Sequence, residues 1–168
     1  VGVFEPLWAP HMDNLGASTM VVTLSLSAFA LPMLVLARWA GGLSDRYSPR
    51  LTSLLSALAT VPLMASYGWI TAVPVLFIAM LPHGIMEVIQ SPGSQAAVAD
   101  AAPADDAASA QGLGEAMGSA ASMVGALSAA PIYAWLGPGP AFSIAALAMG
   151  GFLGLSWLLD PPPLEKQR

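Results

Sequence analysis

The sequence predicts an all-helical membrane protein with five full transmembrane helices and one partial helix. Of its 168 residues, 56% are hydrophobic and only 9% are charged, whereas a soluble domain carries about 25% charged residues. Three stretches, 14–37, 51–86 and 116–159, contain no Asp, Glu, Lys or Arg. Because so few charges cannot cover a globule in water, lipid is the expected solvent for much of the surface. We expect a single transmembrane domain over residues 1–168.

Helix-breaking residues divide these stretches into spans of the required length. Since about 20 apolar residues cross the hydrocarbon, 51–86 and 116–159 must each hold two helices. The turns within them are marked by 67–74 and by Gly137-Pro138-Gly139-Pro140, and 45–50 and 100–106 are further connections. The resulting prediction is a partial helix at about 1–9 and full helices near 19–41, 51–68, 74–99, 107–136 and 141–159.

The five basic residues predict how the chain is oriented. Alternate threading puts the 42–50 loop, the 100–106 loop and the tail 161–168 on one side of the bilayer. All basic residues then lie on or next to that side: Arg38, Arg46, Arg50, Lys166 and Arg168. By the positive-inside rule that side is cytoplasmic. We therefore expect a multi-pass protein of the cell (inner) membrane with a cytoplasmic carboxy-terminal tail.

Composition also bears on the classes of function. A net charge of −5 provides no basic patch for nucleic acid. The absence of Cys excludes disulfides and thiolate metal sites. Neither a Gly-x-Ser-x-Gly nor a His-Glu-x-x-His pattern is present, so we predict no catalytic residue, no metal, no cofactor and no enzyme activity.

The most specific pattern is the segment from Gly41 to Arg50. It reads Gly-Gly-Leu-Ser-Asp-Arg-Tyr-Ser-Pro-Arg and resembles the G-x-L-[AS]-D-R-x-G-[RK]-[RK] motif of the major facilitator superfamily. Ser48 and Pro49 depart from that motif. The matching residues are Gly41, Leu43, Ser44, Asp45, Arg46 and Arg50.

The resemblance extends over essentially the whole chain. Residues 91–103 are similar to the end of the family's fourth or tenth helix, and 5–18 resemble the exit from its seventh helix. The resemblance implies the carboxy-terminal six-helix half of a transporter, truncated in its first helix, with the missing amino-terminal half as its partner. It also implies that the motif latches the outward-facing state. The residues alone leave open a basic loop that only fixes orientation.

Small residues predict where backbones approach closely. Gly41 and Gly42 would permit such an approach beside the motif. In the predicted helix near 107–136, small residues recur at steps of three or four: Gly114, Gly118, Ser122, Gly125 and Ala129. This spacing predicts a flat face for helix packing.

Polar residues inside a predicted span are the main candidates for a site, because an ionisable group in hydrocarbon is costly unless it is paired or hydrated. His83, Glu87, Gln90 and Ser94 fall within a sector of about 60° at 100° per residue. This polar stripe should face a water-filled cavity or another helix. Glu87 could exchange a proton with His83 or bind a cationic substrate, or the group could be a structural hydrogen-bond cluster.

Glu5 is a further candidate, because it lies beside Pro6 in the partial helix, where a break near a central cavity is expected. Lining that cavity and bonding to another helix remain open for it.

Two functions agree with these features. The first is secondary active transport of a small organic solute, in the form of proton-coupled efflux or antiport, with membrane lipid, protons and the solute as partners. The alternative is a non-transporting membrane receptor or assembly subunit of the same fold.

Overall fold

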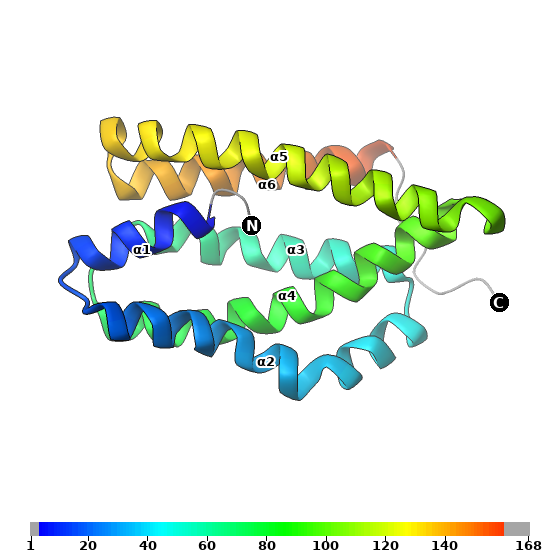
Figure 1. Cartoon of the computed structure of the whole chain (residues 1–168), viewed down its shortest axis with the longest axis horizontal. Coiled ribbons are helices and arrows are strands. Elements are labelled where there is room, and N and C mark those ends of the chain that lie inside the picture. The colour runs from blue at the N-terminus through cyan, green and yellow to red at the C-terminus, as the bar shows by residue number, and fades with distance from the viewer. Residues whose placement is uncertain (1–3, 160–168) are drawn as a thin grey trace.

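Six α-helices and one short 3₁₀-helix, η1, make up the described part of the chain (Figure 1). The computed structural model describes residues 4–159, except for the side chains of Glu5 and Ala104. The predicted all-α fold is confirmed, since no strand occurs among these residues. The elements are α1 (Phe4–Asn14), α2 (Thr19–Arg46), α3 (Pro49–Tyr67), α4 (Val73–Ala101), η1 (Ala104–Asp106), α5 (Ala107–Leu136) and α6 (Pro138–Leu159).

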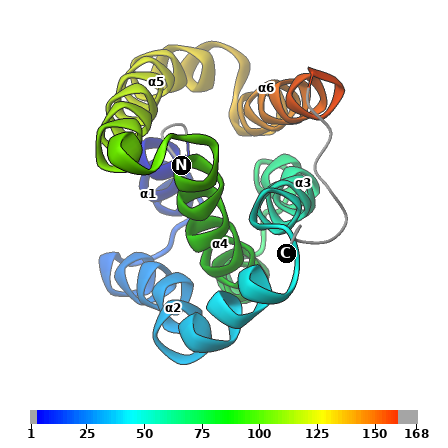
Figure 2. The same ribbon diagram turned by 90° about the vertical axis from the view of Figure 1, so that its right-hand side faces the viewer.

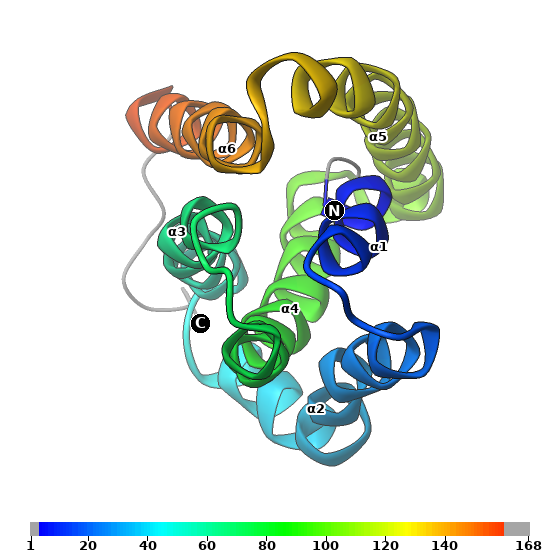
Figure 3. The same cartoon turned by 90° about the vertical axis from the view of Figure 1, so that its left-hand side faces the viewer.

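Helix α4 is the central element of the bundle. Viewed from one end, it lies between α2 and α3, and α6 packs against the other side of α3 (Figure 2). The view from the opposite end shows α1 beside α5 (Figure 3). Helix α5 packs only lightly against α4, α1 and α6. The bundle is therefore tight around α4 and looser around α5.

The connections alternate between the two ends of the bundle, as the predicted threading requires (Figure 1). Residues 47–48 and 102–106 lie at one end, which we call the motif end. Residues 15–18, 68–72 and 137 lie at the other end. Two of the basic residues, Arg46 at the end of α2 and Arg50 at the start of α3, lie at the motif end.

Four of the described helices are long and apolar enough to cross a membrane: α2, α4, α5 and α6. The 19-residue helix α3 is long enough but less apolar, because serine and threonine recur along it. Those hydroxyls bond to their own helix: Thr52, Ser56 and Thr60 donate to carbonyls one turn earlier, at 2.8 to 3.0 Å. Since all three are buried, α3 presents less polar surface than its composition implies.

Several predicted boundaries were wrong. Helix α1 continues through Pro10 to Asn14, and Pro6 does not break it. Helix α2 continues through the glycine pair to Arg46, so most of the motif is helical and not a loop. Pro138 begins α6, where its fixed φ and missing N–H are tolerated, so only Gly137 separates α5 from α6.

Four of the glycines predicted to allow close packing face open space, whereas Ala129 of the same predicted face is buried in the main core. A Cβ atom at Gly41, Gly42, Gly114 or Gly118 would meet no other atom within 4 Å. At Gly84 it would collide with the carbonyl of Phe29 on α2. Close approach therefore occurs where α4 crosses α2, because α4 carries a glycine where the two backbones meet.

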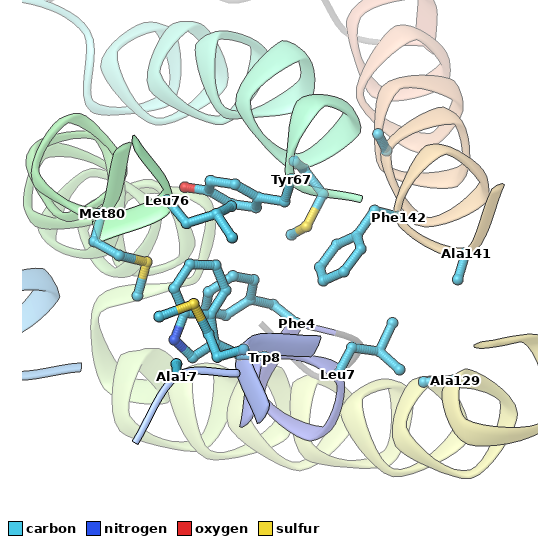
Figure 4. Packing of buried hydrophobic residues seen from close by; sticks show 13 residues of the cluster. Phe4, Leu7, Trp8, Ala17, Tyr67, Leu76, Met80, Ala129, Ala141 and Phe142 are labelled. Atoms are coloured by element: carbon cyan, nitrogen blue, oxygen red, sulfur yellow. The ribbon is translucent and has the colours of Figure 1, made fainter. Parts of the chain in front are cut away.

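The main hydrophobic core lies at the end opposite the motif (Figure 4). Trp8, Tyr67 and Phe142 are fully buried there, and they come from α1, α3 and α6. The Nε1 atom of Trp8 donates to Ser25 Oγ of α2 at 2.9 Å, and Met80 extends from α4 into the same cluster. The 11-residue helix α1 is thus held by side chains from at least three other helices.

Candidate functional site

The motif residues occupy the last turns of α2 and the first turn of α3. Asp45 and Arg46 are exposed, whereas Ser44 is buried. The hydroxyl of Ser44 lies 3.4 Å from Oγ1 of Thr52 on α3. Gly41 and Leu43 lie on the preceding turn, and the Leu43 carbonyl accepts the closing hydrogen bond from Tyr47. The motif thus joins two helices through a buried contact and leaves an exposed acid and base at the surface.

Arg50 lies apart from the other charged motif residues. It is half-buried in the first turn of α3, and its Nη2 atom donates to the carbonyl oxygen of Ser156 on α6 at 3.1 Å. Because a guanidinium group can hold several acceptors in a fixed geometry, this contact fixes α3 against α6 at the motif end.

His83, the first residue of the polar stripe, is buried within an aromatic group. Its ring lies 5.1 Å from Phe4, 5.2 Å from Phe29 and 5.7 Å from Tyr67, measured between ring centroids. Its Nδ1 atom lies 2.9 Å from the hydroxyl of Tyr67. His83 therefore faces other helices, and its polar atom is satisfied there.

Glu87 lies one turn further along α4 and is half-buried. No hydrogen bond or ion pair joins it to His83 or to any other residue that the structure describes. Their spacing places the two side chains on one face of α4, but the structure shows no contact between them. Glu87 is therefore an unpaired carboxyl group in the middle of a candidate span.

Gln90 and Ser94 line two different cavities. Gln90 lies at a cavity of about 460 Å³ among α3, α4, α5 and α6. Ser94 lines a cavity of about 390 Å³ between α4 and α5, together with Gln95, Gln111 and Glu115. The stripe thus passes through separate environments, because α4 meets different neighbours along its length.

Glu115 belongs to this second cavity, eight residues after the start of α5. Gln111 lies one turn before it, so both side chains face α4. Sequence spacing relates Glu115 to Gln111 but not to Ser94 and Gln95, because only the packing of α4 on α5 brings the two pairs together.

A second polar group, at the end opposite the motif, was missed from the sequence. His11 is buried, and its Nε2 atom lies 3.0 Å from the carbonyl of Tyr67. Its Nδ1 atom lies 3.3 Å from the hydroxyl of Tyr133, and the side-chain amide of Asn14 donates to that same hydroxyl at 3.1 Å. The partners are more than 50 residues apart along the chain, so only the fold relates α1 to α3 and α5 here.

Within the described residues, no three His, Cys, Asp or Glu side chains lie close enough together to hold a metal ion. The side chain of Glu5 and the tail 161–168 lie outside the described part of the chain.

Comparison with known families decides the wider assignment. The model of the Major Facilitator Superfamily matches the chain over residues 1–168. The chain belongs to the major facilitator superfamily. The predicted resemblance to this superfamily is thereby confirmed, and the six-helix arrangement agrees with a half bundle of that family. A search among curated proteins finds none that matches the chain.

Membership in this superfamily makes the chain a multi-pass integral membrane protein of a transporter family. The four apolar helices are its clearest candidate spans. For a superfamily member, polar groups inside those spans are the natural place to look for solute or ion contacts. In the described part of the chain, Glu87 is the ionisable group that best meets this description.

Proposed function

We propose that this chain forms one half of a secondary active transporter that exports a small organic solute in exchange for protons. The observation that carries the proposal is Glu87, a half-buried carboxyl group on α4 with no hydrogen-bond partner among the described residues. A permanent charge at such a depth costs several kcal/mol. A carboxyl group that takes up a proton becomes neutral, so Glu87 would avoid that cost in the protonated state of the transport cycle.

The proposed partner is a second helical bundle, the amino-terminal half. Alternating access requires one bundle to rock against another around a shared site. The polar cavity lined by Ser94, Gln95 and Glu115 gives this chain a surface from which such a site could be built. Glu87 and Gln90 lie about two turns and one turn before Ser94 on α4, and we propose that they, with His83 and Glu5, serve the solute or the proton.

We further propose that the motif end faces the cytoplasm of the inner membrane. The exposed Asp45 and Arg46 would then pair with groups on the second bundle and stabilise one state. The support is the gathering of Arg46 and Arg50 at the motif end and the positive-inside rule.

The substitution Glu87→Gln tests the coupling in proteoliposomes of the complete transporter. It keeps the shape of the side chain but removes the exchangeable proton. If Glu87 carries the proton, uptake driven by a pH gradient should fall at least tenfold, while solute exchange without a gradient persists. Asp105→Asn, which removes an exposed acid from the α4–α5 connection, is the control and should leave both activities intact.

Other outcomes separate the alternatives. Loss of both activities with weaker solute binding would indicate that Glu87 binds a cationic solute. Normal accumulation by Glu87→Gln at normal expression would contradict a proton-carrying role. Absence of any solute flux in the unsubstituted protein would favour a receptor or assembly subunit.

A further inference from the structure

The last turns of α1, α3 and α5 meet at the end of the bundle opposite the motif, and we call their polar contact the outer junction. It consists of His11 and Asn14 of α1, Tyr133 of α5 and the backbone carbonyl of Tyr67, the last residue of α3. His11 lies at its centre and is only 2% exposed. The ring of Phe142 on α6 covers it, at 5.4 Å between centroids. All of these partners follow His11 in the chain, so the junction is built without any segment that precedes α1.

The hydrogen bonds of the outer junction select one tautomer of His11. The carbonyl of Tyr67 can only accept a hydrogen bond, so the Nε2 atom of His11, 3.0 Å away, donates to it. In a neutral imidazole the other nitrogen then carries no hydrogen and accepts. Nδ1 of His11 therefore accepts from the Tyr133 hydroxyl at 3.3 Å, and this hydroxyl accepts from the amide of Asn14 at 3.1 Å. The bonds thus run in one direction, from Asn14 through α5 and back through His11 to α3.

A proton on His11 would disturb this order at one place. Both nitrogens of an imidazolium ring are donors, so Nδ1 would direct a hydrogen at the hydroxyl of Tyr133. That hydroxyl already accepts from Asn14, and it would have to turn and find a new acceptor for its own hydrogen. The bond from Nε2 to the Tyr67 carbonyl would remain. Protonation therefore weakens the contact between α1 and α5 and leaves the contact between α1 and α3 in place.

The charge of a protonated His11 would have no counter-charge in the outer junction. The two tyrosines are neutral and Phe142 is apolar, while Asp13 of α1 is exposed and makes no ion pair with His11. Of the other charged residues on the packed helices, Arg50 of α3 and Glu115 of α5 lie toward the motif end. Helix α6 carries no charged residue between 138 and 159. Because burying an unpaired charge is costly, the closed junction favours the neutral ring.

Three helix ends offset part of that cost. Helices α1, α3 and α5 all end near His11, and the negative ends of their dipoles favour a cation. Histidine ordinarily takes up a proton at about pH 6.5. With the helix ends in its favour, His11 can take up a proton in mildly acidic surroundings once water reaches the ring. Movement of α5 away from α1 would admit that water, because Asn14, at the rim of the junction, is exposed.

We propose that the outer junction is a proton-sensitive fastening between α1 and α5. Neutral His11 holds the two helix ends together, and a proton on His11 releases α5 from α1 while α1 stays bound to α3. This role is separate from that of Glu87 in the middle of α4 and requires no transport of solute. With the motif end in the cytoplasm, as proposed above, an acidic exterior would open the junction.

Distances between spin labels in the complete transporter, held in lipid nanodiscs, test this inference. The labels are attached to cysteines that replace Asp13 of α1 and Ala134 of α5, both exposed, with any cysteines outside this chain replaced. Labelling position 13 also removes the nearest acid of α1, which then cannot cause a response. When the pH is lowered from about 7.5 to about 5, across the usual range of histidine, the distance should increase by several ångströms.

A reference pair of labels at Thr71 and Ile144 reports on the same end of the bundle. Both positions are exposed, and the nearby bond from Trp69 Nε1 to Ser143 Oγ, at 3.0 Å, contains no group that takes up a proton in this range. The distance of this pair should stay the same on acidification. An equal increase in both pairs would show general loosening and would overturn the inference.

Three variants assign the response. His11→Gln keeps a donor for the Tyr67 carbonyl but takes up no proton, so the distance between labels 13 and 134 should not depend on pH. Tyr133→Phe removes the hydroxyl that joins α5 to His11, so the labels should be further apart already at neutral pH and should not respond to acid. Tyr47→Phe removes a hydroxyl that makes no hydrogen bond to another described residue, and it should leave the response unchanged.

Nuclear magnetic resonance of protein with ¹⁵N-labelled histidine tests the tautomer directly. The signal that disappears in His11→Gln should report hydrogen on Nε2 at neutral pH, and hydrogen on Nδ1 would overturn the inference. A label distance that does not change with pH, or that changes equally in His11→Gln, would do the same. Should His11→Gln fail to fold, an unaltered acid response in Tyr133→Phe would overturn it. No gradient or solute is needed, so these results and those of the transport experiment can be told apart.

Discussion

At the scale of single residues, Tyr67 of α3 connects two buried polar groups, one around His83 and one around His11. Its hydroxyl lies 2.9 Å from Nδ1 of His83 and 3.2 Å from the carbonyl of Ala79, and its own carbonyl lies 3.0 Å from Nε2 of His11. Tyr67→Phe should therefore lower the free energy of unfolding by about 1 kcal/mol, because His83 loses its hydroxyl partner in an apolar core. Unfolding of the purified complete transporter in detergent would measure the change.

Tyr47→Phe is the matched control, because Tyr47 is 43% exposed and its hydroxyl makes no hydrogen bond to another described residue. We expect no measurable change there. Equal stability of both variants would show that the Tyr67 hydroxyl does not stabilise the core. Spacing along α4 could relate His83 to Glu87, but the partner of His83 lies on another helix, and no local pattern in α3 indicates which way Tyr67 points.

At the scale of elements, α2 and α4 can cross closely because residue 84 is a glycine and has no side chain. A methyl group there would collide with the carbonyl of Phe29 and press on the ring of Pro32. Gly84→Ala should destabilise the bundle by about 1–3 kcal/mol, the usual cost of overpacking. Gly118→Ala, on the open face of α5, should instead stabilise by about 0.5–1 kcal/mol, since alanine favours a helix over glycine. Thermal unfolding of both variants checks the contrast, and destabilisation of equal size at both positions would contradict it.

The number and order of the helices could be predicted from charge-free stretches and helix breakers, but several ends could not. The sequence predicts a turn at Pro138 and Pro140, but proline is compatible with the first turn of a helix, and α6 begins there. Helix α2 is predicted to end near residue 41 but continues to Arg46, because a helix tolerates glycine when the pattern continues beyond it. Of the small residues of α5 that are predicted to pack closely, Ala129 is buried, but Gly114 and Gly118 face open space, because spacing alone does not show where a neighbouring helix lies.

At the scale of the whole molecule, the connections between helices lie alternately at the two ends of the bundle. This arrangement predicts which positions share one side of the membrane. Asp45 and Asp105 are exposed at the motif end, and Thr71 is exposed in the 68–72 connection at the other end. Single cysteines at positions 45 and 105 should react with a membrane-impermeant maleimide only from the cytoplasm, and one at position 71 only from outside. Because the chain contains no Cys, no native cysteine within it needs to be removed.

Reaction of positions 45 and 105 from opposite sides would contradict the threading. Reaction of both from outside would keep the fold but reverse the orientation. The basic residues could predict an orientation because their distribution along the chain is a property of the sequence. They could not predict the polar cavity beside Ser94, because it arises only where α4 packs on α5.

Gly137 has a mechanical consequence for the pair of helices it joins. It is the single residue between α5 and α6, with φ at +80° and ψ at 177°, a conformation that side chains with a Cβ atom rarely adopt. Its N–H donates to the carbonyl of Tyr133 on α5, and its own carbonyl accepts from the N–H of Ala141 on α6. Gly137 is therefore hydrogen-bonded to both of the helices that it connects. Because the connection is a single residue, we expect the two helices not to slide past each other there. A relative movement of α5 and α6 would then be a rotation about Gly137, largest at the far end of α6 near Ser156. At that far end α6 is held to α3, and not to α5, by the contact of Arg50 with the Ser156 carbonyl, so a swing that separates α5 from α6 leaves the packing of α3 on α6 in place.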